Sequence, residues 1–142
     1  MLINPFLEKI NQTPHANKLN MQLVGVEESA ITIKLPFSGH IIGDPFDNII
    51  HSGAITTLID TACGGAVFQT QQNFRALATL DLRVDYMRPA VSTKDIQAYA
   101  HCYKLTDTIA FVRATVFIEN INDPVATAMC TFMRSQQEFP TT

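Results

Sequence analysis

The sequence predicts an α+β fold in which a curved antiparallel sheet of about six strands wraps around one long helix. The helix is predicted by a mainly apolar segment from His51 to Val67, whose large apolar residues recur every three or four positions. Two strand-like segments precede this helix and four follow it. One helix cannot cover both faces of such a sheet, so we expect the sheet to curve around it.

Composition limits the classes of protein to which the chain can belong. Its 142 residues suffice for one domain, 1–142, with a sizeable core, and 46% of them are hydrophobic. A net charge of −3 gives no reason to expect nucleic acid as a partner. No segment reaches the length needed to span a membrane, and acidic Glu8 argues against a signal peptide. We therefore expect a cytoplasmic protein.

The potential metal ligands are dispersed along the chain. Cys63, Cys102 and Cys130 lie in apolar segments and form no Cys-x-x-Cys motif, which predicts buried free thiols in a reducing compartment. The 4 histidines are scattered without ligand spacing. We therefore expect no metal site.

Before the central helix we expect a short helix, a hairpin and a loop. Residues 4–12 form an amphipathic pattern that Pro14 ends, and this helix covers the sheet or acts as a lid over a ligand groove. Residues 21–27 and 30–35 are predicted to pair as an antiparallel hairpin. Residues 37–50 are rich in Gly, Pro and Asp and are predicted to form a long loop of the kind that is often functional.

After the helix, four strands are predicted at 78–87, 95–105, 109–119 and 125–134. The first alternates strictly, with one face formed by Leu80, Leu82, Val84 and Tyr86 and the other by Thr79, Asp81, Arg83 and Asp85. In the later strands, Phe111, Phe117 and Phe132 cannot all point inward with their neighbours. An apolar outer face favours a partner subunit.

Asp60 is the only charged residue between His51 and Arg75, and it lies in the middle of the predicted helix. A carboxylate in a buried apolar helix is costly unless it is paired or functional. A hydrogen bond to Thr56 or Thr57, one turn earlier, would give it a structural role. A catalytic role is the alternative.

Two groups of residues resemble a known family. Residues 43–45, 51–53 and 58–62 read Gly-Asp-Pro, His-Ser-Gly and Leu-Ile-Asp-Thr-Ala, and residues 79–90 read Thr-Leu-Asp-Leu-Arg-Val-Asp-Tyr-Met-Arg-Pro-Ala. Together they resemble the motifs of hotdog-fold acyl-CoA thioesterases, most closely the phenylacetate-pathway and 4-hydroxybenzoyl-CoA group. The resemblance covers about Asn4 to Arg134. It departs at Ser52, where the family usually has Gly.

The resemblance implies hydrolysis of an acyl-CoA thioester, with coenzyme A as part of the substrate and no separate cofactor. It implies that the Gly53 N–H polarises the carbonyl and that Asp60 either attacks directly or activates water. As the expected N-cap of the helix, Ser52 would leave the Gly53 N–H open. Further catalytic roles fall on His51 and Thr79. Substrate or CoA contacts fall on Asp44, Ser52, Asp81, Arg88, Pro89, Lys104 and Thr108.

Alternatives remain open at this point. His51 and Asp44 could instead satisfy the loop backbone, and Arg88 and Lys104 could be solvated surface charges. A hotdog-fold enoyl-CoA hydratase or dehydratase would pair His51 with the helix carboxylate. A non-catalytic acyl-CoA-binding module would need neither the carboxylate nor the carbonyl-polarising amide.

The spacing within the helix predicts a shared site. Gly53 and Asp60 are seven residues apart, about 10.5 Å along the axis at 1.5 Å per residue, so one carbonyl cannot reach both in the same chain. If both act, Asp60 serves the substrate of a second subunit, which predicts a homodimer or homotetramer. Gly64 and Gly65 cost about 1 kcal/mol each within a helix and would suit the close approach of another backbone.

Overall fold

The computed structural model describes Leu7 and residues 10–91 and 93–138 of the chain. Its short elements before the central helix are η1 (Ile10–Gln12), α2 (Pro14–Lys18), β1 (Gln22–Val26), β2 (Ala30–Leu35), η2 (Gly39–Ile41), β3 (Ile42–Asp44) and β4 (Ile49–Ile50). The helix α3 (Ser52–Thr70) and the strands β5 (Arg75–Tyr86), β6 (Ile96–Leu105), β7 (Ile109–Phe117) and β8 (Ala126–Glu138) follow.

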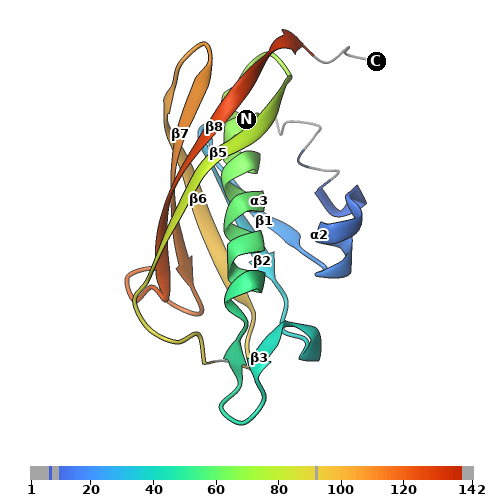
Figure 1. The fold of residues 1–142 in the computed structure, drawn as a ribbon, viewed down its shortest axis with the longest axis vertical. Helices are drawn as coiled ribbons and strands as arrows, with labels where there is room; N and C mark the ends of the chain where they lie inside the picture. The colour runs from blue at the N-terminus through green and yellow to red at the C-terminus, as the bar shows by residue number, and fades with distance from the viewer. Residues whose placement is uncertain (1–6, 8–9, 92, 139–142) are drawn as a thin grey trace.

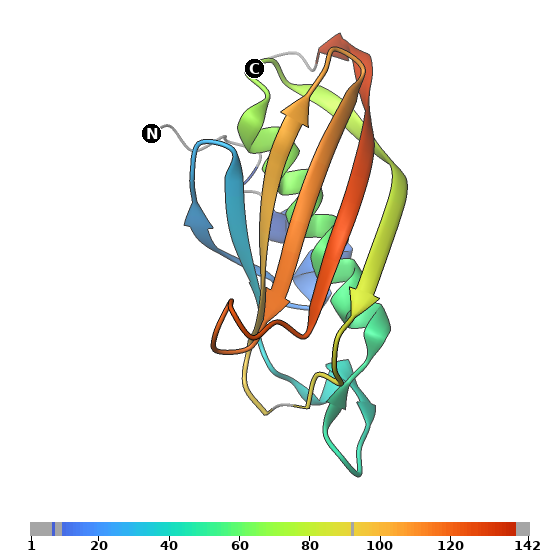
Figure 2. The same ribbon diagram turned by 90° about the vertical axis from the view of Figure 1, so that its left-hand side faces the viewer.

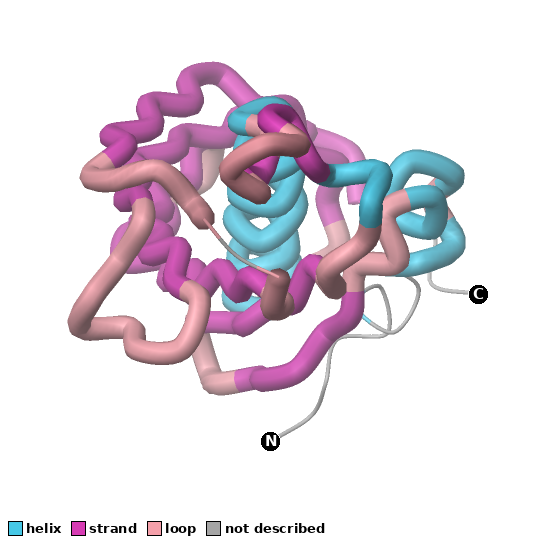
Figure 3. Tube along the Cα trace, turned by 90° about the horizontal axis from the view of Figure 1, so that it is seen from below, coloured by secondary structure: helices cyan, strands magenta, loops and turns pink. Residues whose placement is uncertain are grey.

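Six of these strands form one antiparallel sheet in the order β1-β2-β6-β7-β8-β5, and the sheet curves around α3 (Figures 1 and 2). Viewed from below, α3 is seen end-on with strands on more than one side (Figure 3). This arrangement confirms the predicted α+β hotdog architecture.

The helix α3 buries one side against the sheet. Its apolar residues, among them Leu58, Ile59 and Ala62, are fully buried in the core. The opposite side carries Asp60 and Gly64, which are only partly buried. The helix is therefore not buried on all sides, and the carboxylate of Asp60 lies at the boundary of the core.

The segment before α3 differs from the prediction in two places. Pro14 begins α2 instead of only ending a helix, because its fixed φ suits the first position of a helix and it needs no N–H acceptor there. Residues 37–50 are not only a loop: they contain η2 and the β3–β4 hairpin, which lies below the N-terminus of α3 in Figure 1. The predicted helix over residues 4–12 lies largely outside the described residues.

The aromatic and sulfur side chains divide between core and surface. Phe132 is buried in the core, whereas Phe111 and Phe117 are partly exposed and Met129 and Met133 lie exposed on the outer face. All three cysteines are buried free thiols, as predicted. A partner subunit on the outer face stays a prediction.

In the part of the chain that the structure describes, no helix is long and apolar enough to cross a membrane. The same residues include no group of three or more His, Cys, Asp or Glu side chains arranged to hold a metal ion.

Candidate active site

The first turn of α3 is organised by His51. The His51 N–H donates to the Ile41 carbonyl at 2.7 Å, and the imidazole Nδ1 accepts the Gly53 N–H at 2.8 Å. His51 is therefore the N-cap, and the expectation that Ser52 caps the helix is wrong: Ser52 is the first helical residue. The imidazole nitrogen takes the position that a Ser or Asp oxygen usually occupies.

This cap changes which backbone donor is open. The Gly53 N–H is occupied by His51 Nδ1, whereas the Ser52 N–H has no acceptor among the described residues. Because Nδ1 accepts a hydrogen bond, the neutral imidazole carries its proton on Nε2. Among the described residues, the helix N-terminus therefore presents two donors without an acceptor, the Ser52 N–H and His51 Nε2–H. Such donors at a helix N-terminus can bind an oxygen with developing negative charge.

Two glycines make room for this imidazole and its backbone. A Cβ at Gly53 would lie 2.9 Å from His51 Nδ1, and a Cβ at Gly43 would lie 3.0 Å from His51 Cα. Any larger side chain at these positions would displace His51. The packing of His51 against Gly43 and Gly53 thus explains the sequence pattern Gly43 … His51-Ser52-Gly53.

Tyr86 holds the same turn from the other side. Its hydroxyl donates to the Ser52 carbonyl at 3.2 Å and lies 3.3 Å from Thr56 Oγ1. The residue comes from the end of β5, so the strand and the helix N-terminus are fixed to each other. Sequence reasoning placed Tyr86 on a strand face but missed this contact; an aromatic residue at a strand end, with a hydroxyl seeking a partner, was the only available signal.

A pocket of about 590 Å³ lies beside this turn. It brings together five of the predicted site residues: Asp44, His51, Ser52, Arg88 and Pro89. Its walls are mainly apolar and come from the β3–β4 hairpin, the first helical turn and residues 86–90. Asp44 Oδ1 accepts the Phe46 N–H at 2.9 Å, so this carboxylate also stabilises the hairpin turn.

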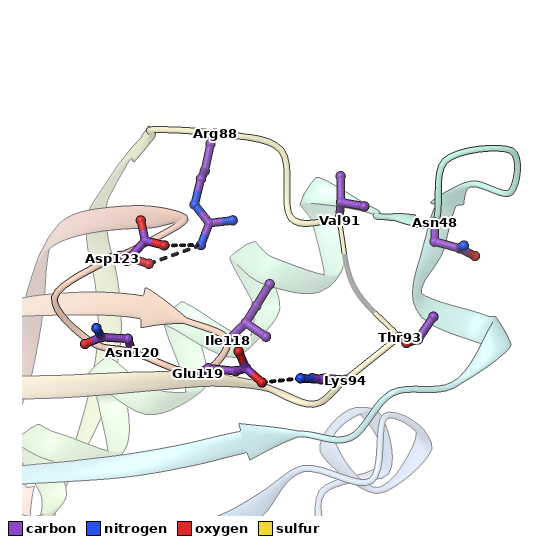
Figure 4. A pocket seen from close by; sticks show the side chains of 9 residues that line it. All are labelled: Asn48, Arg88, Val91, Thr93, Lys94, Ile118, Glu119, Asn120 and Asp123. Atoms are coloured by element: carbon purple, nitrogen blue, oxygen red, sulfur yellow. Dashed lines mark hydrogen bonds and ion pairs between the residues drawn. The ribbon is translucent and has the colours of Figure 1, made fainter.

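Arg88 also lines a neighbouring pocket of about 490 Å³ (Figure 4). Arg88 Nη2 donates to the carbonyl oxygen of Asp123 at 3.1 Å and lies 3.4 Å from its Oδ2, while Nε is buried without an acceptor among the described residues. Lys94 and Glu119 form a further ion pair, which lies on another side of this pocket in Figure 4. The arginine is thus positioned by an exposed ion pair, which is weak enough to exchange for a ligand phosphate.

Asp60 lines a third cavity, of about 530 Å³, which shares no lining residue with the pocket at the helix N-terminus. Asp60 Oδ1 accepts a hydrogen bond from Thr79 Oγ1 at 2.8 Å. Thr56 and Thr57 donate instead to the carbonyls of Ser52 and Gly53, four residues earlier. The structural explanation of Asp60 by these two threonines is therefore wrong.

A β-bulge in β5 brings Thr79 to Asp60. The register with β8 shifts between Thr79 and Asp81, leaving Leu80 unpaired and 54% exposed. Thr79 lies opposite Phe132 and Leu82 opposite Cys130, both of which are buried, so Thr79 and Leu82 share the inner face. Strict alternation, as predicted, would put them on opposite faces. Bulges commonly redirect side chains in this way next to active sites.

Helix and strands together form the walls of the Asp60 cavity. α3 contributes Asp60, Thr61, Gly64, Gly65 and Phe68; β5 and β8 contribute Leu77, Thr79 and Phe132; the N-terminal region contributes Leu7, Ile10, Gln12 and Thr13. We call this cavity the Asp60 groove. The described part of the N-terminal region thus forms one wall of the groove, while the choice between a covering element and a lid stays a prediction.

The two helical glycines have different surroundings. A Cβ at Gly65 would lie 2.4 Å from Ile31 Cδ1, so the residue is needed for the packing of α3 against β2 in the same chain. A Cβ at Gly64 would meet Phe132 Cε1 at 3.7 Å, an ordinary contact. The expectation that both glycines serve another backbone is therefore wrong for Gly65. Gly64 costs the helix about 1 kcal/mol without a reason within the fold.

Three predicted binding residues lie away from both cavities. Asp81 is opposite Thr131 and exposed on the outer face of the sheet. Lys104 and Thr108 flank the β6–β7 turn, near the C-terminal end of α3, where Arg134 joins Gln71 to Thr106. The 19-residue helix, about 28 Å long, separates this turn from Arg88 in one copy of the chain.

Burial and hydrogen bonding make Cys63 unreactive. Its Sγ lies 3.1 Å from Cys130 Sγ, and this hydrogen bond, together with burial, raises the pKa of the Cys63 thiol well above 9.0. The thiol therefore stays protonated at neutral pH. Cys63, three residues after Asp60, is therefore not a catalytic nucleophile, because a thiol must lose its proton to attack.

Comparison with known proteins identifies relatives of this chain. The model of the thioesterase superfamily matches residues 47–125, more than half of the chain. A solved protein from Pseudomonas aeruginosa is 36% identical over 92% of this chain and 100% of its own, with a TM-score of 0.81. The curated proteins contain no significant match.

Two more distant solved structures share the fold. A thioesterase from Haemophilus influenzae is 18% identical, covers 95% of this chain and 92% of its own, and has a TM-score of 0.82. A phenylacetic acid degradation-related protein from Ralstonia eutropha is 17% identical, covers 90% of this chain and 98% of its own, and has a TM-score of 0.75.

Proposed function

Because this chain belongs to the thioesterase superfamily, we propose that it hydrolyses acyl-CoA thioesters to a free acid and coenzyme A in a site shared by two copies. The observation that carries the proposal is the Asp60–Thr79 pair. Asp60 is the only carboxylate on α3 and borders a groove, and its one hydrogen-bond partner among the described residues leaves Oδ2 available.

In the proposed reaction, Asp60 provides the attacking group. As a general base, its carboxylate takes a proton from water while the water oxygen bonds to the thioester carbon. As a nucleophile, it attacks the carbon itself, and water later hydrolyses the resulting anhydride. Either way the C–S bond breaks and the sulfur leaves as the CoA thiolate. Thr79 fixes the carboxylate in both routes, so the geometry leaves this choice open.

The thioester oxygen gains negative charge during the attack, and the helix N-terminus supplies its donors. The Ser52 N–H is the open amide there, and His51 Nε2–H is the second donor that the same turn offers. Donors held in place before the reaction stabilise this charge without reorganisation. We therefore assign the polarising amide to Ser52, while Gly53 keeps His51 in position.

The donors at the helix N-terminus form one half-site and Asp60 forms the other. Their separation supports an active site that two copies share. Ser52 and Asp60 are eight residues apart, about 12 Å along the helix, and they border different cavities. One carbonyl cannot contact both within a single copy. A second copy that supplies Asp60 to this copy's helix N-terminus resolves the conflict.

The surface beside these half-sites suits such a partner. Among the described strands, β5 pairs only with β8 and forms an edge of the sheet, next to exposed Leu80, Tyr86 and Met87. Long unpaired edges with apolar side chains favour association. Antiparallel pairing of two β5 strands would place the Arg75 end of one beside the Tyr86 end of the other.

This pairing would also unite the predicted CoA contacts. Arg75 Nη2 lies 3.2 Å from Oδ1 of Asp107 in the β6–β7 turn, so this turn lies beside the Arg75 end of β5. The partner's Lys104 and the partner's Thr108 would then approach Arg88 of this copy. A phosphate between them would be bound by cations from both copies.

The test is a thiol-release assay with acetyl-, octanoyl-, palmitoyl- and phenylacetyl-CoA. Asp60→Asn keeps the shape of the side chain but removes its charge, so we expect kcat to fall by roughly 10²–10⁴-fold with unchanged melting temperature. The matched control, Glu28→Gln, alters an exposed carboxylate at the β1–β2 turn and should retain the wild-type rate.

Three outcomes would contradict the proposal. Full activity of Asp60→Asn would remove the proposed base or nucleophile. Hydration of enoyl-CoA without thiol release would identify a hydratase. Tight binding of every acyl-CoA without turnover would identify a binding module.

A further inference from the structure

We propose that Gly64 sets the length of the acyl group that the protein accepts, by keeping the Asp60 groove open to a neutral, apolar chain. The proposal rests on the proposed thioesterase function and adds a substrate class to it.

The groove follows one face of α3. Asp60, Gly64 and Phe68 are spaced by four residues and therefore lie above one another on the helix. The distance from Asp60 to Phe68 is about 12 Å along the axis. An acyl chain whose thioester carbon lies at Asp60 can extend along this face towards Phe68.

The opposite walls are suited to hydrocarbon. Leu77 and Phe132 line the groove from the sheet, and Leu7 and Ile10 line it from the N-terminal region. The other polar lining residues, Gln12, Thr13, Thr61 and Thr79, are uncharged.

Charge restricts the acyl group further. Among the described lining residues, Asp60 carries the only charge, and no Arg, Lys or His accompanies it. An acyl group ending in a carboxylate would bury its charge between apolar walls towards Phe68, without a compensating cation among the described lining residues. We therefore infer a neutral acyl chain of medium length or an unsubstituted aryl-acyl group.

Gly64 lies midway along this path, opposite Phe132. A Cβ would contact the ring at 3.7 Å, so alanine fits the fold without conflict and fills part of the groove. At Gly65 the same atom would collide with Ile31 at 2.4 Å. Packing within the chain thus explains why position 65 is glycine, but it does not explain why position 64 is glycine, where alanine would stabilise the helix. Space for the acyl chain of the substrate explains the glycine at position 64.

The experiment measures kcat/KM for acetyl-, hexanoyl- and decanoyl-CoA with Gly64→Ala and Gly64→Val. Removing room for about one methylene in an apolar pocket changes selectivity by roughly tenfold or more. We expect Gly64→Val to reduce kcat/KM for decanoyl-CoA by roughly tenfold or more, and for acetyl-CoA by less than about twofold. Gly64→Ala should give a smaller shift together with a higher melting temperature.

Gly39→Ala is the matched control, because its new Cβ has no neighbour within 4 Å and it lies outside the groove. Its length profile should equal that of the wild type. An equal loss for every chain length, with dissociation of the oligomer in sedimentation, would assign Gly64 to a contact between subunits. An unchanged profile in both Gly64 variants would also overturn the proposal. A wild-type protein that releases no thiol from any acyl-CoA would instead refute the proposed function itself.

Discussion

The two half-sites on α3 are built from different parts of the chain. At the helix N-terminus, the main chain and two glycines fix His51 and Ser52, with hydrogen bonds of 2.7 and 2.8 Å within one copy. Around Asp60, side chains from α3, β5, β8 and the N-terminal region form an open groove. The fixed half would contact the thioester and CoA, which every substrate shares. The half made of side chains would contact the acyl group, which differs between substrates.

At the fixed half, the largest effect is expected from removing the main-chain donor. Ser52→Pro deletes the open N–H, while proline suits the first helical position and His51 already has an extended ψ of 130°. We expect a loss of roughly 10²–10³-fold in kcat, the usual effect of one oxyanion donor. Ser52→Ala keeps the amide and should stay near wild type. Equal rates for both variants would show that the Ser52 N–H is not the donor to the thioester oxygen.

Mixing inactive copies tests whether the halves come from different subunits. Ser52→Pro and Asp60→Asn are each expected to be nearly inactive alone, whereas a mixed dimer retains one intact site. After unfolding and refolding together in equal amounts, activity should recover to about one quarter, since half of the dimers are mixed and each has one good site of two. A site within one chain would give no recovery.

At the side-chain half, Thr79 is expected to have a smaller effect than Ser52. Thr79→Val preserves shape but removes the hydrogen bond to Asp60, and such bonds to charged groups correspond to roughly tenfold or more in rate. We expect kcat to fall by about that factor while KM changes little. Thr79→Ser should restore the rate, which a purely structural role in β5 would not require.

Gly65, unlike Gly64, is expected to affect the free energy of unfolding, because its place in the helix is set by packing within the chain. Gly65→Ala forces Ile31 Cδ1 away from a position 2.4 Å from the new Cβ, and overpacking of this kind costs about 1–3 kcal/mol. The helix gains about 1 kcal/mol in return, so denaturant unfolding should show a small net loss. Ile31→Val removes the colliding methyl and should rescue the Gly65 variant in a double-mutant cycle. Without rescue, the loss has another cause.

The smallest expected effect is the pH dependence of stability that Cys63 contributes. Its hydrogen bond with Cys130 and its burial raise the pKa of this thiol in the native state, so above 9.0 the unfolded state loses a proton that the native state keeps. The free energy of unfolding should therefore decline with rising pH, by up to about 1.4 kcal/mol per pH unit. Cys63→Ala should show a shallower decline; an identical slope would contradict this origin.

Periodicity was sufficient to predict the helix and the six strands, because burial on one face imposes a regular spacing of apolar residues. The pairing of Thr79 with Asp60 also agrees with the family resemblance. Sequence reasoning missed the bulge, because Leu80 continues the alternation of Leu82 and Val84 even though it points to solvent. It also missed His51 as the cap, because histidine is not a usual N-cap residue and its contact depends on the space left by Gly43 and Gly53. The groove walls come from segments distant in sequence, which local patterns do not relate.

The unpaired Leu80 has a consequence for insertions and deletions in this strand. Removing this single residue would leave Thr79 and Leu82 two positions apart, so a regular strand would still place both on the inner face of the sheet. Thr79 would keep its contact with Asp60, and Leu82 and Val84 would stay in the core. Removing Arg83 instead would leave Leu82 and Val84 adjacent and therefore on opposite faces. Deletion of Leu80, which contacts neither cavity, should therefore be tolerated better than deletion of Arg83.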